Sequence, residues 1–156
     1  MVTKQYMDTG SRAFSYAVMI PLMVFVLFLQ SCTKQPLYQE PVIIDDMVIV
    51  NTSQLIEKRP VFFSYQYNKK MINFFVIKIE GKVSSYLDAC AKCYPKKLGF
   101  GFDNGYIYCR ACNVRHPVEN IEKGFGSCYP IKIAGEEQQG KYFISLKTLQ
   151  EKVDKF

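Results

Sequence analysis

The chain has 156 residues, of which 49% are hydrophobic and 22% are charged, a composition that excludes a mostly disordered polypeptide. Its formal net charge is +6, but the basic residues occur as pairs such as Lys69–Lys70 and form no continuous stripe, so no nucleic-acid partner is expected. The length suits one domain plus an export segment, and the 12 Phe and 11 Tyr favour strands over helices.

Residues 1–31 are predicted to be an export signal. Lys4 and Arg12 precede an apolar stretch at 13–29, and no charged side chain occurs between Ala13 and Thr33. A basic start followed by an apolar middle is the layout of a signal peptide. A stretch of this length could also just cross a bilayer, so an uncleaved anchor helix is the alternative.

The apolar stretch ends in Leu29-Gln30-Ser31-Cys32, which resembles the lipobox of bacterial lipoproteins. In that class of signal the cysteine receives the lipid and becomes the mature N-terminus, so Cys32 is the predicted lipidation site. Several acyl chains on one residue give durable anchoring. The resemblance therefore implies a lipoprotein that faces the periplasm from the outer or the inner membrane. Residues 32–41, with two prolines among polar side chains, are expected to form a tether.

Residues 42–156 are predicted to form one metal-binding domain of the β-rich α+β class. Aromatic and β-branched runs bounded by turn residues predict strands at 42–50, where Asp45-Asp46 interrupts the run, and at 61–67, 71–79, 82–87, 99–102, 106–108, 129–133 and 141–145. Asn104-Gly105 tolerates the positive φ angles of a tight hairpin turn. Leu149 and Val153 lie one helical turn apart, which predicts a short helix within 146–156. We therefore expect small antiparallel sheets, two Cys-x-x-Cys knuckles and a short C-terminal helix.

Four of the five cysteines that follow Cys32 form two Cys-x-x-Cys pairs. Cys90 and Cys93 form the first pair, Cys109 and Cys112 form the second, and 15 residues separate the pairs. This spacing is typical of a tetrahedral metal site, because each pair turns two thiolates to one side and a hairpin between the pairs brings them together. Thiolates suit zinc, a single iron or an iron–sulfur cluster, so the spacing leaves the metal open.

Disulfide bonds are the main alternative, since exported proteins meet oxidising conditions. Five cysteines cannot pair completely within one mature chain, and Cys-x-x-Cys disulfides are usually redox-active. Cys128, which follows Gly126-Ser127, is either an additional metal or redox residue or a buried free cysteine. His116, four residues after Cys112, is an alternative ligand. Asp88 is expected to cap the turn that carries the first cysteine pair.

Three segments of the chain resemble the FtrD-like membrane-associated iron–sulfur-containing proteins: Asp88-Ala89-Cys90-Ala91-Lys92-Cys93-Tyr94, Cys109-Arg110-Ala111-Cys112-Asn113 and Gly126-Ser127-Cys128-Tyr129-Pro130-Ile131. The resemblance covers roughly residues 42–156. It implies an iron–sulfur cluster or mononuclear iron held by Cys90, Cys93, Cys109 and Cys112, with Cys128 as a further motif residue. It also implies electron transfer linked to iron uptake, with an iron permease or a periplasmic iron-binding protein as partner. Many relatives carry several membrane helices, whereas this sequence has only the export segment.

No nucleophile–base pair or pair of acids points to a hydrolase, so we expect an electron carrier or metal-binding protein more than an enzyme. Two other functions stay open. One is a non-catalytic binding module with a structural zinc site. The other is a thiol–disulfide redox protein, although such proteins usually carry a single Cys-x-x-Cys motif at a helix start, and this sequence has two motifs among predicted hairpins.

Overall fold

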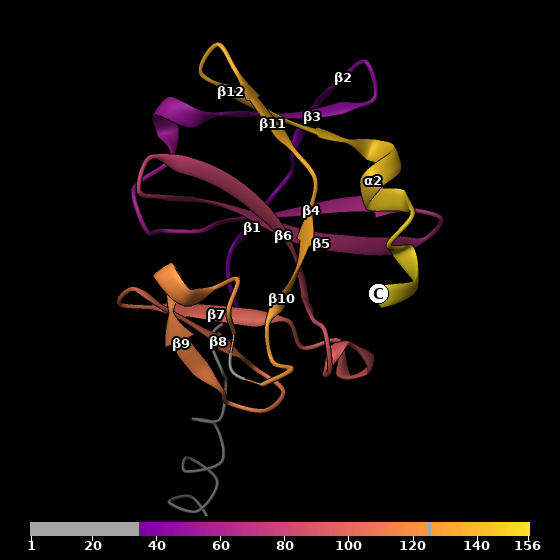
Figure 1. Cartoon of the computed structure of the whole chain (residues 1–156). Coiled ribbons are helices and arrows are strands. Elements are labelled where there is room, and N and C mark those ends of the chain that lie inside the picture. Colours follow the sequence, from indigo (N-terminus) through magenta and orange to yellow (C-terminus); the bar gives the residue numbers. More distant parts are fainter. Residues whose placement is uncertain (1–34, 125) are drawn as a thin grey trace, which may run out of the picture. The chain divides into compact units, whose positions relative to one another are not determined.

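The computed structural model describes residues 35–124 and 126–156, so the predicted export signal and Cys32 lie outside the described residues. The described part forms one unit built around three sheets (Figure 1). A five-stranded sheet has the order β1 (Tyr38–Gln39), β4 (Val61–Tyr67), β5 (Lys70–Ile79), β6 (Lys82–Cys90) and β10 (Pro130–Ile133). A four-stranded sheet has the order β11 (Glu136–Gln138), β12 (Lys141–Ser145), β3 (Met47–Asn51) and β2 (Val42–Ile44). The third sheet consists of β7 (Phe100–Asp103), β8 (Tyr106–Cys109) and β9 (Arg115–Pro117).

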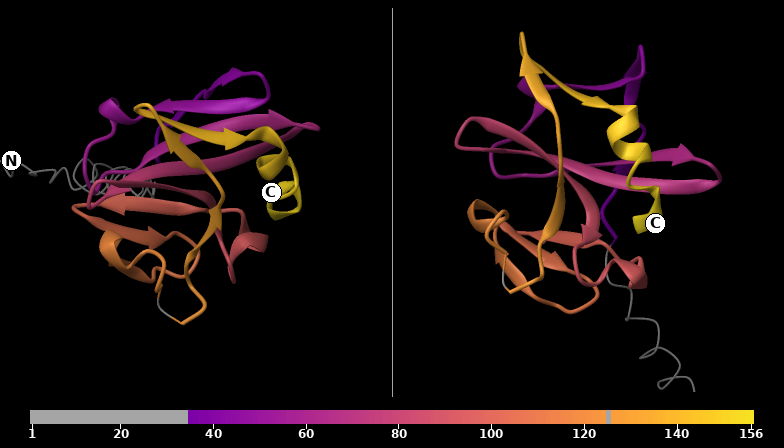
Figure 2. Two further views of the ribbon diagram at one scale, coloured as in Figure 1. Left: turned by 45° about the horizontal axis from the view of Figure 1, so that its top comes forward. Right: turned by 45° about the vertical axis from the view of Figure 1, so that its right-hand side comes forward.

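The five-stranded sheet is the middle layer, with the four-stranded sheet on one face and the three-stranded sheet on the other (Figures 1 and 2). The alternation of side chains along β5 explains this arrangement. Ile72, Phe74 and Val76 enter the hydrophobic core against the four-stranded sheet, whereas Phe75 and Ile77 enter a second core against β7 and β8. Both faces of this strand are buried, so its sequence is an almost continuous apolar run.

The observed fold confirms the predicted β-rich α+β class with a short C-terminal helix. Residues 42–50 do not form one strand, because Asp45 and Asp46 adopt φ angles of 50° and 59° and turn the chain into the β2–β3 hairpin. Aspartate enters this left-handed region more readily than most residues. The predicted helix is α2 (Leu146–Gln150), followed by a 3-10 turn, η4 (Val153–Lys155). Within the described residues, no helix is both long and apolar enough to cross a membrane.

Three short strands have no counterpart among the predicted elements: β1, β9 and β11. The strand β1 lies in the predicted tether and pairs in parallel with β4, with Tyr38 opposite Phe62. It therefore joins the start of the described chain to the edge of the middle sheet. Strands of two or three residues are too short to produce a periodic pattern in the sequence.

Candidate metal centre

The first cysteine pair begins at the end of β6. Along this strand Asp88 and Cys90 share the face that points toward β7 and β8, because side chains alternate and the intervening Ala89 packs into the opposite core. Cys93 directly precedes the 3-10 turn η2 (Tyr94–Lys96). The N–H group of Ala91 donates a 3.0 Å hydrogen bond to the carbonyl oxygen of Tyr129, which ties this turn to the segment that carries Cys128.

The second pair begins at the end of β8 and is a tight knuckle. The N–H group of Asn113 donates a 2.8 Å hydrogen bond to the carbonyl oxygen of Cys109, and the N–H of Cys109 donates to Val114 at 2.9 Å. Asn113 has a φ angle of 57°, as a residue that follows such a pair often requires. These bonds turn the thiols of Cys109 and Cys112 toward one side.

Cys128 is brought to the same place by the middle sheet. It lies two residues before β10, and this strand pairs with β6 so that Pro130 lies opposite Cys90. The Cys128 sulfur lies 3.7 Å from that of Cys90 and 3.4 Å from that of Cys112. It therefore contacts one cysteine of each knuckle.

Five thiols thus gather at one end of the domain, and all five are free. Two groups of three have sulfur atoms within 4.8 Å of one another: Cys90, Cys109 and Cys128, and Cys93, Cys109 and Cys112. Four sulfurs around one zinc-sized ion, each about 2.3 Å from it, lie about 3.8 Å apart. The four cysteines expected from the sequence are therefore brought close to one another, although neither group contains all four, and Cys128 joins Cys90 and Cys109 in the first group.

Electrostatics divides the five thiols. Burial raises the pKa of Cys109 to about 12, raises that of Cys93, and raises that of Cys128 far above its ordinary value. Burial also opposes ionisation of Cys90 and Cys112, but backbone N–H groups of their own turns and the neighbouring thiols lower the pKa of both. One sulfur of each knuckle is therefore prepared by the backbone to carry a negative charge, which a metal ligand requires.

Asp88 does not cap the first cysteine turn. Its carboxylate accepts a 2.6 Å hydrogen bond from the N–H group of Phe100 and a 2.5 Å bond from the hydroxyl of Tyr38. Burial raises the pKa of this carboxyl group to about 6, against the two hydrogen bonds, which lower it. A Cβ atom on Gly99 would lie 2.4 Å from Asp88 Oδ2, so only glycine fits there. Asp88 thus joins the strand before the first cysteine pair to the hairpin that carries the second.

His116 is not brought to the thiols. It is buried in β9, opposite Ile107, and neither of the two sulfur groups contains it. Neither ring nitrogen has a hydrogen-bond partner among the described residues, and burial lowers the pKa of the ring. Its position is that of a core residue of the three-stranded sheet.

Five converging thiols on small antiparallel sheets define a cysteine-rich domain that could bind metal. The family model for the membrane iron-sulfur containing protein FtrD-like matches residues 55–156, so the chain belongs to this family. Membership confirms the resemblance expected from the cysteine motifs and indicates an iron-related, membrane-associated function. No curated protein matches the chain. The strands β1, β2 and β3 precede the matched residues.

Proposed function

We propose that this protein is a membrane-tethered iron–sulfur or iron-binding protein that transfers electrons during iron uptake. Cys90, Cys93, Cys109 and Cys112 are the metal ligands in this proposal. Cys32 carries the lipid that holds the domain at the periplasmic side of the outer or inner membrane. An iron permease or a periplasmic iron-binding protein is the electron partner.

The single observation that supports the proposal best is the convergence of free thiols from three separate segments. Cys109 lies in one group of sulfurs within 4.8 Å of one another with Cys93 and Cys112 and in another with Cys90, and backbone N–H groups favour the thiolate form of Cys90 and Cys112. Bound by such strong donors, iron would change its oxidation state without leaving the site. The family description, which includes both iron–sulfur content and a membrane, supports this choice of metal.

Cys128 is proposed to tune the centre as a neutral thiol. Its pKa is raised, whereas the two sulfurs that it contacts, Cys90 and Cys112, have lowered pKa values. The S–H group of Cys128 can donate to the Cys112 sulfur at 3.4 Å, where either sulfur can be the donor, and would stabilise a negative charge there. Hydrogen bonds to ligand sulfurs are among the factors that set the potential of iron–sulfur centres.

The test of the metal is anaerobic purification of the protein, followed by metal analysis and visible spectroscopy. We expect bound iron and visible absorbance that bleaches when dithionite is added. A colourless protein with one equivalent of zinc would support a structural zinc module instead. A metal-free protein whose thiols cycle between dithiol and disulfide would support the thiol–disulfide alternative.

Variants of the same protein test which residues bind the metal and whether the protein acts in iron uptake. Cys109→Ser should lose the iron, and cells that carry only this variant should take up iron slowly when it is scarce. Ser127→Ala, which changes the residue next to Cys128 and removes no thiol, is the control. This variant should keep its iron, and cells that carry it should take up iron at the normal rate. Normal iron content in Cys109→Ser would refute the ligand assignment, whereas normal uptake despite lost iron would refute only the physiological role.

A further inference from the structure

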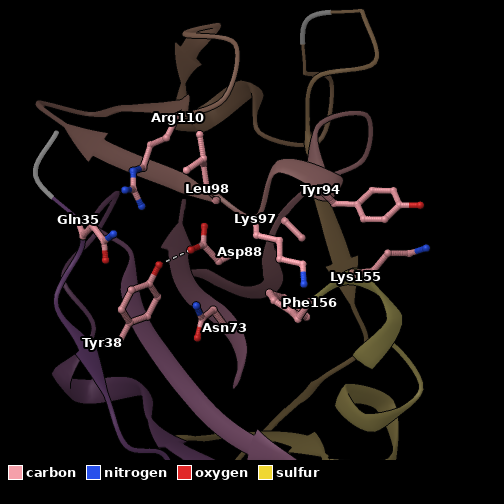
Figure 3. A pocket seen from close by; sticks show the side chains of 12 residues that line it. Gln35, Tyr38, Asn73, Asp88, Tyr94, Lys97, Leu98, Arg110, Lys155 and Phe156 are labelled. Carbon is pink, nitrogen blue, oxygen red and sulfur yellow. Dashed lines mark hydrogen bonds between the residues drawn. The ribbon is translucent and has the colours of Figure 1, made fainter. Parts of the chain in front are cut away.

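The described chain begins beside the first cysteine knuckle. Gln35, the first described residue, lines a cavity of about 80 Å³ whose wall also includes Tyr38, Asp88, Lys97, Leu98 and Arg110 (Figure 3). Figure 3 shows Gln35 on the same side of this cavity as Arg110, which separates Cys109 from Ala111 in the second knuckle. The described chain therefore begins at the end of the domain where the five thiols gather, which we call the metal end.

The distance from Cys32 to Gln35 is limited by covalent geometry. Three residue steps span at most about 11 Å. A folded unit the size of residues 35–156 has a radius of gyration of about 14 Å. If Cys32 carries the lipid, as the proposed function holds, the tether is too short for the opposite end of the domain to turn toward the bilayer. The strand β1 and the Tyr38–Asp88 hydrogen bond hold the residues that follow Gln35 against the domain.

The surface next to this point has the composition of a membrane-contacting surface. Lys92, Lys96 and Lys97 are exposed in and after the first knuckle, and Leu98 is 42% exposed. Leu37, three residues before Glu40 in the same N-terminal segment, is 86% exposed. Lysines near a bilayer are attracted to anionic headgroups, and exposed leucines can enter the boundary between headgroups and acyl chains.

The described residues offer a second exposed apolar segment, and its charge argues against membrane contact. In β2, Val42, Ile43 and Ile44 are 62%, 40% and 53% exposed. The turn that follows carries Asp45 and Asp46, both exposed, which anionic headgroups would repel. The surface around Leu98 is therefore basic, whereas the surface around β2 is acidic, and the two belong to different parts of the fold.

We infer that the metal end of the domain lies against the bilayer, with Lys92, Lys96 and Lys97 on anionic phospholipid headgroups and Leu98 inserted between them. Cys90 lies two residues beyond Asp88 on β6, about 7 Å along the strand. The five thiols are consequently held close to the membrane surface, where an integral membrane partner can reach them, and the four-stranded sheet points away from the lipid.

The absence of tryptophan from the sequence provides a clean test. Leu98→Trp and Ile44→Trp each introduce a single indole, one on each surface. The full lipid-bearing protein is placed in vesicles of brominated phosphatidylcholine and phosphatidylglycerol. We expect emission from Leu98→Trp to be quenched at least twofold more than emission from Ile44→Trp. Equal quenching, stronger quenching at Ile44→Trp, or no quenching at either position would overturn the inference, and the last result would leave this surface to a protein partner.

The attraction between the lysines and anionic headgroups is tested by reversing the charge at two lysine positions in the Leu98→Trp variant. Lys96→Glu with Lys97→Glu should reduce quenching in vesicles that contain phosphatidylglycerol, whereas Lys141→Glu with Lys147→Glu, an equal charge change on the four-stranded sheet and α2, should not. Equal effects of the two pairs would refute headgroup recognition. Palmitate labelling and iron content of the same preparations report separately on the anchor and on the metal site, so failure of the proposed function is distinguishable from failure of the orientation.

Discussion

The hydroxyl of Tyr38 donates a 2.5 Å hydrogen bond to the carboxylate of Asp88, 50 residues later in the chain. The contact joins the N-terminal strand β1 to the strand that ends in Cys90. Because Asp88 also accepts from the N–H group of Phe100, one buried carboxylate holds three segments together beside the thiols. Burial and the neighbouring Asp88 raise the pKa of the Tyr38 hydroxyl far above its ordinary value, so the hydroxyl stays protonated as a donor.

Tyr38→Phe should lower the free energy of unfolding by about 1–3 kcal/mol, since a buried carboxylate loses one of its two donors. Urea denaturation measures the change. Tyr106→Phe, at a hydroxyl-bearing ring that is 43% exposed, is the matched control and should cost little. Equal effects of the two substitutions would show that the Tyr38–Asp88 bond contributes nothing particular.

Gly99→Ala should destabilise the domain more than Gly81→Ala. Both glycines have positive φ angles, 66° and 76°, so both substitutions carry the backbone cost of alanine, about 1–2 kcal/mol. Only at Gly99 does a Cβ atom collide with Asp88, whereas nothing lies within 4 Å of it at Gly81. Overpacking at Gly99 should lower the free energy of unfolding by about 1–3 kcal/mol more, which urea denaturation measures. Equal losses of stability in the two variants would contradict the close approach of Gly99 to Asp88.

The cysteine spacing and the Asn104-Gly105 turn made much of the site predictable from sequence. A pair of Cys-x-x-Cys motifs on either side of a hairpin allows few arrangements other than convergence, and the hairpin forms as expected between β7 and β8. The contact of Tyr38 with Asp88 was not predictable. It joins a polar, proline-containing segment to a strand by one long-range bond, and neither end shows a pattern that marks the other.

Cys128→Ala should lower the reduction potential of the iron-loaded protein while leaving the iron bound. Loss of one hydrogen-bond donor to the ligand sulfurs, about 0.5–1.5 kcal/mol, corresponds to about 20–65 mV for a one-electron couple. Redox titration followed by visible absorbance measures it. Cys128→Ser retains an O–H donor and should recover much of the change. Complete loss of iron in both variants would instead make Cys128 a ligand.

His116 should make the domain sensitive to mild acid. Its pKa is lowered in the folded protein by burial, so on acidification the unfolded chain takes up a proton before the folded chain does. The contribution to stability is therefore full above the unfolded-state pKa, about 6.5, and is lost as the pH falls below it.

His116→Phe removes this titration without removing the ring from its site. The fall in melting temperature between pH 7.5 and pH 5 should be smaller in this variant than in the parent protein. Acid release of thiolate-bound metal affects both proteins equally and is cancelled in the difference. An identical fall in the two proteins would contradict a buried neutral histidine.

In the metal-bound protein of the proposed function, removal of the metal with a chelator under reducing conditions should loosen one layer of the fold before the others. The three-stranded sheet carries Cys109 and packs in the same core as Cys90 and Cys128, whereas the opposite core contains none of the five cysteines. Hydrogen exchange should therefore accelerate in β7, β8 and β9 and change little in β3 and β12. Uniform acceleration would indicate that the centre stabilises all layers alike.

The division of 42–50 into two strands shows where sequence patterns reach their limit. Asp45-Asp46 separates two β-branched runs, and an interruption of two polar residues is compatible with a bulge, a kink or a turn. The positive φ angles of Asp45 and Asp46 and the pairing of β2 with β3 make it a hairpin, and β3 also pairs with β12, nearly a hundred residues later. Local sequence propensity predicts which residues form strands, but strands distant in the chain determine how those strands pair into sheets.

The pairing of β3 with β12 also sets the order of events during biosynthesis. Met47 lies opposite Ser145, so the four-stranded sheet cannot close until almost the whole chain has left the ribosome. All five clustered cysteines are synthesised before that moment. The core that contains the cysteines has no residue from the four-stranded sheet, so the two knuckles can assemble before that sheet closes.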